Sequence, residues 1–236
     1  MRTMNTLGRV VGLWRYPIKS MAAEPLQEVE LSWQGLAGDR RWAFVRGGME
    51  KSNFPWLTIR QLPELWHYRP RFLEPGKPES SATHVHTPDG RELDVTDPAL
   101  AAELGHDARV IRQNRGAFDV LPVSVISTQT VASLGAALGT NLDVLRFRPN
   151  LLIEATGDAA HPEDDWVGAT LRIGDAEIRV DKRDGRCVVI TVDPATGTPD
   201  PAILRAVAQT REGCLGVYGS TVRPGRVALG DAVVLG

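Results

Sequence analysis

The cysteine at position 187 has the most chemically suggestive setting in the sequence. Three cations precede it closely, at Lys182, Arg183 and Arg186. Cations close to a thiol favour the thiolate, which is the form that attacks electrophiles and binds metals. The β-branched run that follows predicts a strand over residues 187–192, so Cys187 would lie at the mouth of that strand. The same local pattern also fits a small structural thiol at a strand start.

Three further cations stand beside turn residues at the edges of expected strands. Lys19 follows Tyr-Pro-Ile, Arg40 follows Gly-Asp, and Arg148 precedes Pro-Asn and an apolar strand. Converging lysines and arginines bind phosphate or another anion, whereas each cation alone would be a solvated surface charge. Lys19 could also form a Schiff base. Nothing else in the chain resembles a pyridoxal phosphate enzyme, so we do not expect that cofactor.

The remaining candidate ligands fit structural roles better. Cys214 follows an expected helix and has little cationic company, as a partly buried structural thiol would. Two cysteines do not make a disulfide framework. Among the five histidines only His84 and His86 are close in sequence, and no other ligands are near them, so we expect no histidine zinc site. The acidic run 163–165 would bind a hard cation or, as we favour, form a solvated turn.

Short apolar segments separated by 23 glycines and 16 prolines predict a mainly β protein. Alternating apolar and polar residues indicate two hairpins, over residues 171–180 and 227–235, each with a Gly-Asp-Ala turn. Further strands are expected over residues 10–16, 26–33, 42–45, 120–126, 151–154 and 187–192.

Three helices are expected between these strands. Asp97 and Asp200 are predicted N-caps, each followed by a proline, for helices over residues 97–104 and 200–211. The helix over residues 128–138 has apolar residues recurring on one face. The predicted fold class is therefore mainly β with a few helices (α+β), β-barrel-like and not alternating βαβ. The glycine motifs of nucleotide-binding folds are absent from the sequence.

Length and charge set broad limits on function. The 236 residues suffice for two domains, and we place them at 7–116 and 117–236, with the boundary near residues 115–118. The formal net charge of −2 gives no reason to expect nucleic acid or an anionic membrane as a partner. Neither a signal peptide nor an apolar run of about 18 residues occurs, so the sequence predicts a cytoplasmic protein.

Six short motifs occur in the order in which they occur in one protein family. They are Tyr16-Pro-Ile-Lys-Ser20, Asp39-Arg-Arg-Trp42, Arg60-Gln61, Phe147-Arg-Pro-Asn150, Glu163-Asp-Asp-Trp166 and Arg186-Cys187 with Thr191-Val-Asp-Pro194. Over nearly its whole length the chain resembles the MOSC-domain proteins, whose name comes from the C-terminal domain of molybdenum cofactor sulfurase. Within them it is most similar to the mitochondrial amidoxime-reducing component and its bacterial relatives. It departs at Met21-Ala-Ala23, so the lip of the site is expected to differ.

This resemblance implies a β-barrel MOSC domain and an N-terminal β-barrel-like domain, with the molybdenum cofactor in the cleft between them. It implies that Cys187 binds the molybdenum of a pyranopterin cofactor, since a soft thiolate suits a metal already held by sulfur. The other residues that it places around the pterin and its phosphate are Lys19, Ser20, Arg40, Ser127, Thr128, Arg148, Asn150, Arg186 and Tyr218. Cations and polar side chains of these types suit an anionic cofactor rich in donors and acceptors.

Two functions follow from the resemblance. The first is a molybdenum-cofactor oxidoreductase that removes oxygen from amidoximes, hydroxylamines or N-oxides. Its electrons would come from a separate flavin, ferredoxin or cytochrome protein, because the sequence contains no ferredoxin domain. The second is a carrier of the cofactor or of sulfur, with a persulfide on Cys187. A carrier needs Cys187 exposed and gives Lys19, Arg40 and Arg148 no reason to converge on it. A specialised biosynthetic enzyme on the same scaffold is a third, weaker alternative.

Overall fold

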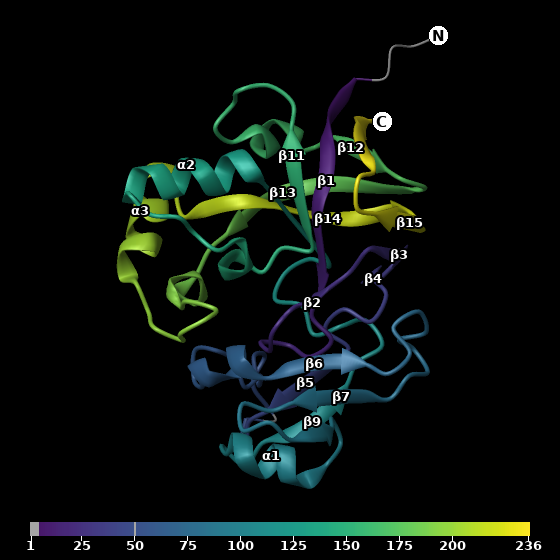
Figure 1. Cartoon of the computed structure of the whole chain (residues 1–236), viewed down its shortest axis with the longest axis vertical. Coiled ribbons are helices and arrows are strands. Elements are labelled where there is room, and N and C mark those ends of the chain that lie inside the picture. The colour runs from purple at the N-terminus through teal and green to yellow at the C-terminus, as the bar shows by residue number, and fades with distance from the viewer. Residues whose placement is uncertain (1–4, 50) are drawn as a thin grey trace.

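The structure is a computed structural model that describes residues 5–49 and 51–236. Seven of its strands close into a barrel, which forms the upper body in Figure 1. In order around the ring they are β1 (Thr6–Arg15), β11 (Leu151–Ala155), β10 (Val123–Ser127), β14 (Cys214–Arg223), β13 (Ala176–Gly185), β12 (Thr170–Ile173) and β16 (Ala232–Leu235). Because β1 pairs with both β11 and β16, the first strand of the chain closes a barrel built otherwise from its second half.

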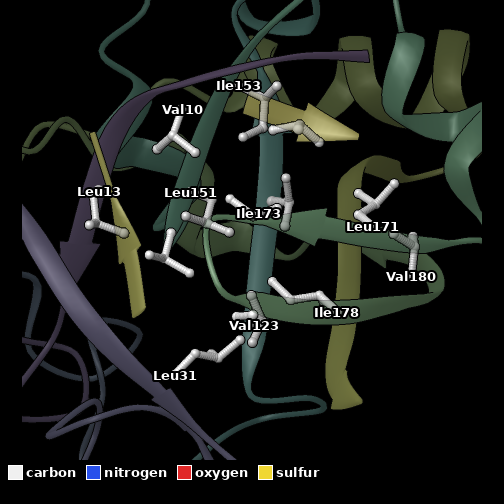
Figure 2. Packing of buried hydrophobic residues seen from close by; sticks show 14 of the residues in the cluster. Val10, Leu13, Leu31, Val123, Leu151, Ile153, Leu171, Ile173, Ile178 and Val180 are labelled. Atoms are coloured by element: carbon white, nitrogen blue, oxygen red, sulfur yellow. The ribbon is translucent and has the colours of Figure 1, made fainter. Parts of the chain in front are cut away.

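Apolar side chains fill the barrel, as Figure 2 shows. Along β12 and β13 the inward positions Leu171, Ile173, Ile178 and Val180 have no exposed surface, while polar residues alternate with them. A strand points successive side chains to opposite faces, so this alternation gives the barrel one apolar face. The hairpin expected over residues 171–180 is confirmed, since β12 and β13 pair directly.

The second expected hairpin, over residues 227–235, is wrong. β15 (Gly225–Ala228) pairs with β3 (Glu28–Ser32), which also pairs with β4 (Gly35–Leu36), whereas β16 pairs with β1 and β12. The turn between β15 and β16 is bound by β1: the Gly230 N–H donates to the Val10 carbonyl at 2.8 Å, and the Val10 N–H donates to the Asp231 carbonyl at 2.9 Å. Closing the barrel therefore directs the two strands into different sheets.

Small sheets make up the lower body in Figure 1. Its elements are β5 (Trp42–Val45) paired with β9 (Arg109–Arg112), the sheet of β6 (Arg69–Phe72), β7 (Thr83–His86) and β8 (Glu92–Asp94), and α1 (Pro98–Leu104). β2 (Glu24–Pro25) continues the pairing of β1 toward this body. A second apolar core, which includes Ile18, Phe44 and Leu100, holds these elements together. The expected fold class, mainly β with a barrel and a few helices, is confirmed.

Two longer helices lie beside the barrel, on the left in Figure 1: α2 (Thr128–Leu138) and α3 (Pro201–Arg211). The predicted caps are confirmed, since the Asp97 carboxylate accepts from the Ala99 N–H and the Asp200 carboxylate accepts from the Ala202 N–H. The short 3-10 helices are η1 (Pro63–His67), η2 (Val144–Phe147), η3 (Pro162–Trp166) and η4 (Val188–Thr191). Throughout the described residues, every helix is too short or too polar to cross a membrane.

The strand expected over residues 187–192 is also wrong, because most of this segment forms η4. The Arg186 N–H makes the last bond toward the neighbouring strand, to the Gly213 carbonyl at 2.8 Å, and the chain then leaves the sheet. Ile190 is buried in a third core with side chains of α3. The Arg146 guanidinium donates to the Thr191 carbonyl at 2.9 Å. Tertiary packing thus overrides the strand preference of a β-branched run, and Cys187 lies between the end of β13 and η4.

Candidate functional site

A cavity of about 210 Å³ lies where the end of β13 meets loops of the lower body. Its wall also includes side chains of β10, β14, η2 and η4. The cations that line it are Lys19, Arg40, Arg60, Arg146, Arg148 and Arg186. Only two carboxylates, Asp119 and Asp184, are among its described lining residues. This imbalance makes the cavity a site for an anion.

Seven of the predicted cofactor residues lie in the wall of this cavity. They are Lys19, Ser20, Arg40, Arg148, Arg186, Cys187 and Tyr218. They come from positions as far apart in the sequence as 19 and 218, so the convergence expected of an anion site is present. The other three predicted residues, Ser127, Thr128 and Asn150, do not line it.

Those three residues have other partners. Asn150 is fully buried and holds the scaffold: its side-chain amide donates to the Trp14 carbonyl and to Asp39, and it accepts from the Ser124 N–H. The Ser127 hydroxyl donates to the buried Glu163 carboxylate at 2.6 Å. Thr128 borders a separate groove along α2. The predicted contacts of these three side chains with a cofactor are therefore not supported by their positions.

Lys19 reaches the cavity from the loop that follows β1. Its backbone N–H donates to the Trp42 carbonyl at 2.8 Å, which fixes the start of the loop. The ammonium donates to the Ala117 carbonyl at 2.6 Å and to the Asp119 carboxylate at 2.5 Å. Burial lowers the pKa of Lys19, and Asp119 opposes that shift. Lys19 therefore lies in the wall as a largely buried cation with one charged partner.

Arg40 and Arg148 both lie over the ring of Tyr16. Their guanidinium carbons lie 4.6 and 4.2 Å from the centre of the Tyr16 ring. Both residues have left-handed backbone, with φ of 49° and 51°, a strained conformation found often at binding sites. Arg40 pairs with the buried Asp39 carboxylate. In Arg148, both terminal nitrogens are buried without a hydrogen-bond partner, and burial lowers its pKa to about 10.

Arg186 is held rigidly beside them. Its Nε donates to the Leu215 carbonyl and its Nη1 to the Phe147 carbonyl, both at 2.7 Å. Nη1 also lies 2.9 Å from the Asp184 carboxylate, while Nη2 is buried without a partner. Unpaired buried donors are costly, so the free N–H groups of Arg148 and Arg186 indicate that an acceptor-rich ligand belongs in the cavity.

Cys187 is the one cysteine among the described residues of the wall, and its side chain is partly exposed. One cation in contact with it is Arg60, whose pKa is raised mainly by a side-chain hydrogen bond with the Cys187 sulfur. The Arg60 guanidinium also lies 5.4 Å from the centre of the Phe54 ring. In the sequence Arg60 is part of a short family motif, which does not predict its contact with Cys187.

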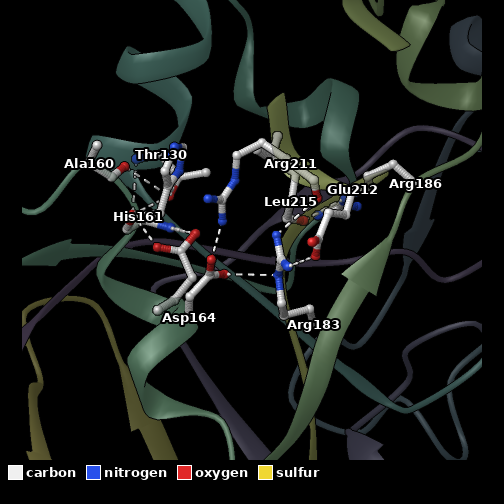
Figure 3. A network of polar contacts seen from close by, with 11 residues as sticks. Thr130, Ala160, His161, Asp164, Arg183, Arg186, Arg211, Glu212 and Leu215 are labelled. Carbon is white, nitrogen blue, oxygen red and sulfur yellow. Dashed lines mark hydrogen bonds and ion pairs between the residues drawn. The ribbon is translucent and has the colours of Figure 1, made fainter. Parts of the chain in front are cut away.

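The cations that precede Cys187 in the sequence do not all lie in the cavity. Arg186 lines the cavity, but Arg183 lies in another network, shown in Figure 3. There its guanidinium pairs with Asp164 at 3.5 Å and with Glu212 at 2.9 Å, and Arg211 also pairs with Asp164. Asp164 thus joins η3 to α3 through ion pairs and is not a solvated turn residue.

Two carboxylates of the cavity were missed as candidate site residues. Asp119 follows the predicted domain boundary; burial tends to raise its pKa, but Lys19 outweighs burial and lowers it. Asp184 is 1% exposed and accepts from the Ser124 hydroxyl at 3.3 Å. Burial raises the pKa of Asp184 to about 6. In the sequence, Asp119 is an acidic residue next to the predicted domain boundary, and Asp184 is one next to the Arg186-Cys187 motif. An acidic residue in such a position does not by itself distinguish a cavity residue from a surface residue.

The wall suits the cofactor that the sequence resemblance implied. One thiol is a soft metal ligand, and the free guanidinium N–H groups of Arg148 and Arg186 match phosphate or pterin acceptors. A site for a small neutral metabolite would not need six cations. By residue type and hydrogen-bonding capacity the cavity therefore fits an anionic, sulfur-bound metal cofactor.

Known proteins match this chain in both halves. The model for the MOSC N-terminal beta barrel domain matches residues 7–120, and the model for the MOSC domain matches residues 113–234. Mitochondrial amidoxime-reducing component 1 of Homo sapiens is 26% identical, over 99% of this chain and 85% of that protein. Mitochondrial amidoxime reducing component 2 of Bos taurus is 25% identical, over 84% of this chain and 70% of that protein.

Molybdenum cofactor sulfurase of Drosophila grimshawi is 27% identical over 86% of this chain, but this match covers 31% of that protein. In structure, the YuaD protein of Bacillus subtilis has a TM-score of 0.54 and 13% sequence identity, over 97% of this chain and 94% of that chain. That likeness concerns the fold alone. With a MOSC model over more than half of its residues and the N-terminal barrel model over most of the rest, the chain belongs to the MOSC-domain family.

Proposed function

We propose that the protein is a molybdenum-cofactor oxidoreductase that reduces N-hydroxylated compounds. Its relatives are named amidoxime-reducing components and molybdenum cofactor sulfurase, and the first of these names corresponds to the reaction that we propose for this chain. The substrates we expect are amidoximes, hydroxylamines and N-oxides. A separate flavin, ferredoxin or cytochrome protein would provide the electrons.

One observation carries the proposal. The cavity brings a single thiol, Cys187, together with buried guanidinium donors of Arg148 and Arg186 that have no partner in the protein. A thiolate ligand for the metal and donors for an anionic organic group are the two parts that this cofactor requires. When bound, the cofactor supplies two-electron chemistry at the metal.

The residues of the chain would then bind and orient. Cys187 would anchor the metal at the end of β13, a position fixed by the last hydrogen bonds of the sheet. Arg186 is already held by two backbone carbonyls, so its remaining N–H groups would bind an anion with little loss of side-chain freedom. Lys19 and Arg40 would add positive charge to the same cavity.

The carrier alternative is less well supported by the geometry. A persulfide carrier requires an exposed thiol that a partner enzyme can reach. Cys187 is only partly exposed, and Lys19, Arg40 and Arg148 line the same cavity as the thiol. A carrier gives no reason for that convergence.

Metal content tests the ligand assignment. We would express the wild-type protein, Cys187→Ala and Cys214→Ala in a host that makes molybdenum cofactor, and measure molybdenum by mass spectrometry. Cys214 is the matched control, since it is also a free, partly exposed thiol but does not line the cavity. We expect near-stoichiometric metal in the wild type and in Cys214→Ala, and a loss of about tenfold or more in Cys187→Ala. Equal metal in all three would contradict the assignment.

Activity tests the choice between enzyme and carrier. The metal-loaded wild type, reduced by a chemical donor, should convert benzamidoxime to benzamidine over many turnovers. Full metal content without turnover on any N-hydroxylated compound would favour the carrier.

A further inference from the structure

A buried carboxyl group lies in the wall of the cavity and has no role in the function proposed above. Asp184 comes from the last residues of β13 and is 1% exposed. It accepts from the Ser124 hydroxyl at 3.3 Å and lies 2.9 Å from Arg186 Nη1. Burying a carboxyl group away from water is energetically unfavourable. Asp184 is not needed to hold Arg186, because two backbone carbonyls already accept hydrogen bonds from that guanidinium.

Four groups face Asp184 from the elements packed around it. They are Arg186 at the end of its own strand, Ser124 of β10, Tyr218 of β14 and Arg40 of the loop after β4. Burial raises the pKa of Asp184 to about 6, against the opposing effect of Arg186. Burial also raises the pKa of Tyr218, and Asp39 raises that of Arg40 against the effect of burial. Asp184 is therefore the member of this group that changes charge near neutral pH.

The other carboxylate of the wall is unsuited to the same role. Asp119 has a side chain that is 51% exposed and lies 2.5 Å from the Lys19 ammonium. Burial tends to raise its pKa, but the Lys19 charge outweighs burial and lowers it. Asp119 is thus an ionised counter-ion of Lys19, while Asp184 can hold a proton.

Reduction of an N-hydroxylated compound consumes protons inside the cavity. Converting R–NH–OH to R–NH2 and water breaks the N–O bond, forms one N–H bond, and takes up two electrons and two protons. The electrons come from the external reductase named in the proposed function. The departing hydroxide is a poor leaving group unless it is protonated as the bond breaks, so an acid beside it speeds the step.

We propose that Asp184 is the general acid that protonates the departing oxygen during N–O cleavage. This inference rests on the proposed function. The Asp184 carboxyl gives its proton to the oxygen, which leaves as water, and the resulting carboxylate is held by Arg186 and Ser124. The second proton, which goes to nitrogen, comes from solvent. Water reprotonates Asp184 after the amine departs.

The pH profile of Asp184→Asn tests this role. Asparagine keeps the size and the hydrogen-bond acceptor but cannot donate this proton. Rates are measured with a chemical donor on benzamidoxime and divided by bound molybdenum, so that a loss of cofactor does not count as a loss of catalysis. We expect the wild-type rate to fall as pH rises above the Asp184 pKa. In Asp184→Asn we expect a rate about 100-fold lower, without this fall of the rate at high pH (the alkaline limb of the profile).

Ser124→Ala is the second variant, since it leaves the carboxyl group in place. The Ser124 hydroxyl stabilises the Asp184 carboxylate and lowers its pKa, so its removal should shift the limb of the profile to higher pH. Infrared difference spectra of the cofactor-free protein, wild type against Asp184→Asn, should show a protonated carboxyl band that disappears on titration through about pH 6.

The outcomes separate the two proposals. If the metal-loaded wild type reduces benzamidoxime and Asp184→Asn has the same rate and the same limb, the acid role is overturned and the proposed function stands. The absence of an infrared band titrating near pH 6 also overturns the acid role. If the loaded wild type reduces no N-hydroxylated compound, the proposed function fails, and the acid role fails with it.

Discussion

The interior of the barrel and the cavity beside it are built from the same strands. β13 gives Ile178 and Val180 to the barrel core and Asp184 to the cavity. β10 likewise gives Val125 to the core, while its neighbour Ser124 faces the cavity. Alternation sends successive side chains to opposite faces, and every residue of β10 is buried. One strand thus builds an apolar interior and a polar one, and the polar one contains buried guanidinium nitrogens of Arg148 and Arg186 without partners.

Irregularities in β13 contribute to this division. The pairing of β13 with β14 shifts register between Val180 and Lys182 and again between Arg183 and Gly185. Such bulges re-aim side chains at the end of a strand. They fall where the polar residues begin, so Arg183 joins the network of α3 while Asp184 lines the cavity. A further shift, between Glu177 and Ile178, lies at the core end of the strand, where Ile178 stays buried in the barrel.

Two arginines with buried nitrogens differ in whether the protein itself provides their hydrogen-bond partners. Arg15 is 1% exposed, and its guanidinium donates to Glu24 and to the carbonyls of Ala37 and Pro75. Arg148 has two buried nitrogens without partners. We expect Arg15→Met to lower the free energy of unfolding by about 3–5 kcal/mol, because it leaves Glu24 unpaired. Arg148→Met should cause no such loss, since it removes unsatisfied donors.

Urea unfolding of the cofactor-free variants measures the change in unfolding free energy. For molybdenum content we expect the opposite order of effects. Arg148→Met should lose metal while Arg15→Met, where folded, keeps it. Equal destabilisation by the two substitutions would mean that Arg148 serves the fold and not a ligand.

Stability should depend on pH through the cavity and not through the barrel core. The folded protein binds the Asp184 proton more tightly than the unfolded chain, since its pKa rises from 3.8 to about 6. Its contribution to stability is therefore present below about pH 4 and lost as pH rises through about 6, a change of roughly 3 kcal/mol. The difference in unfolding free energy between wild type and Asp184→Asn, measured at several pH values, should follow this course. A constant difference would show that the Asp184 pKa is not raised.

A small change in the core should have a modest effect that is independent of pH. Ile178→Val removes one methylene group from a side chain without exposed surface and should cost about 0.5–1.5 kcal/mol in urea unfolding. Molybdenum per folded protein should stay unchanged, because Ile178 lines the barrel and not the cavity. A loss of metal here would show that the two interiors are coupled.

The smallest effect is expected at Thr128. This residue borders the groove along α2 and not the cavity. Thr128→Ala should change neither molybdenum content nor activity, and stability by no more than about 0.5 kcal/mol. Reduced metal content would restore the role that the sequence resemblance gave it.

Local patterns in the sequence were enough to predict several elements. Asp97 and Asp200, each followed by proline, predicted two helix starts correctly, because capping involves only residues close in sequence. The hairpin around Gly174 was predicted for the same reason. The motifs also placed Cys187 among cations, and seven of ten predicted site residues line one cavity.

Tertiary structure alone decided what depends on distant partners. Barrel closure bound the turn at Gly230 to β1 and separated a predicted hairpin, and packing against α3 turned the segment after Cys187 into a 3-10 helix. Polar side chains were also assigned by contacts that no short window contains. Asn150 became part of the scaffold, while Asp184 became part of the cavity. Residue types in the sequence determined which chemical groups were available, and long-range packing determined which of those residues line the cavity.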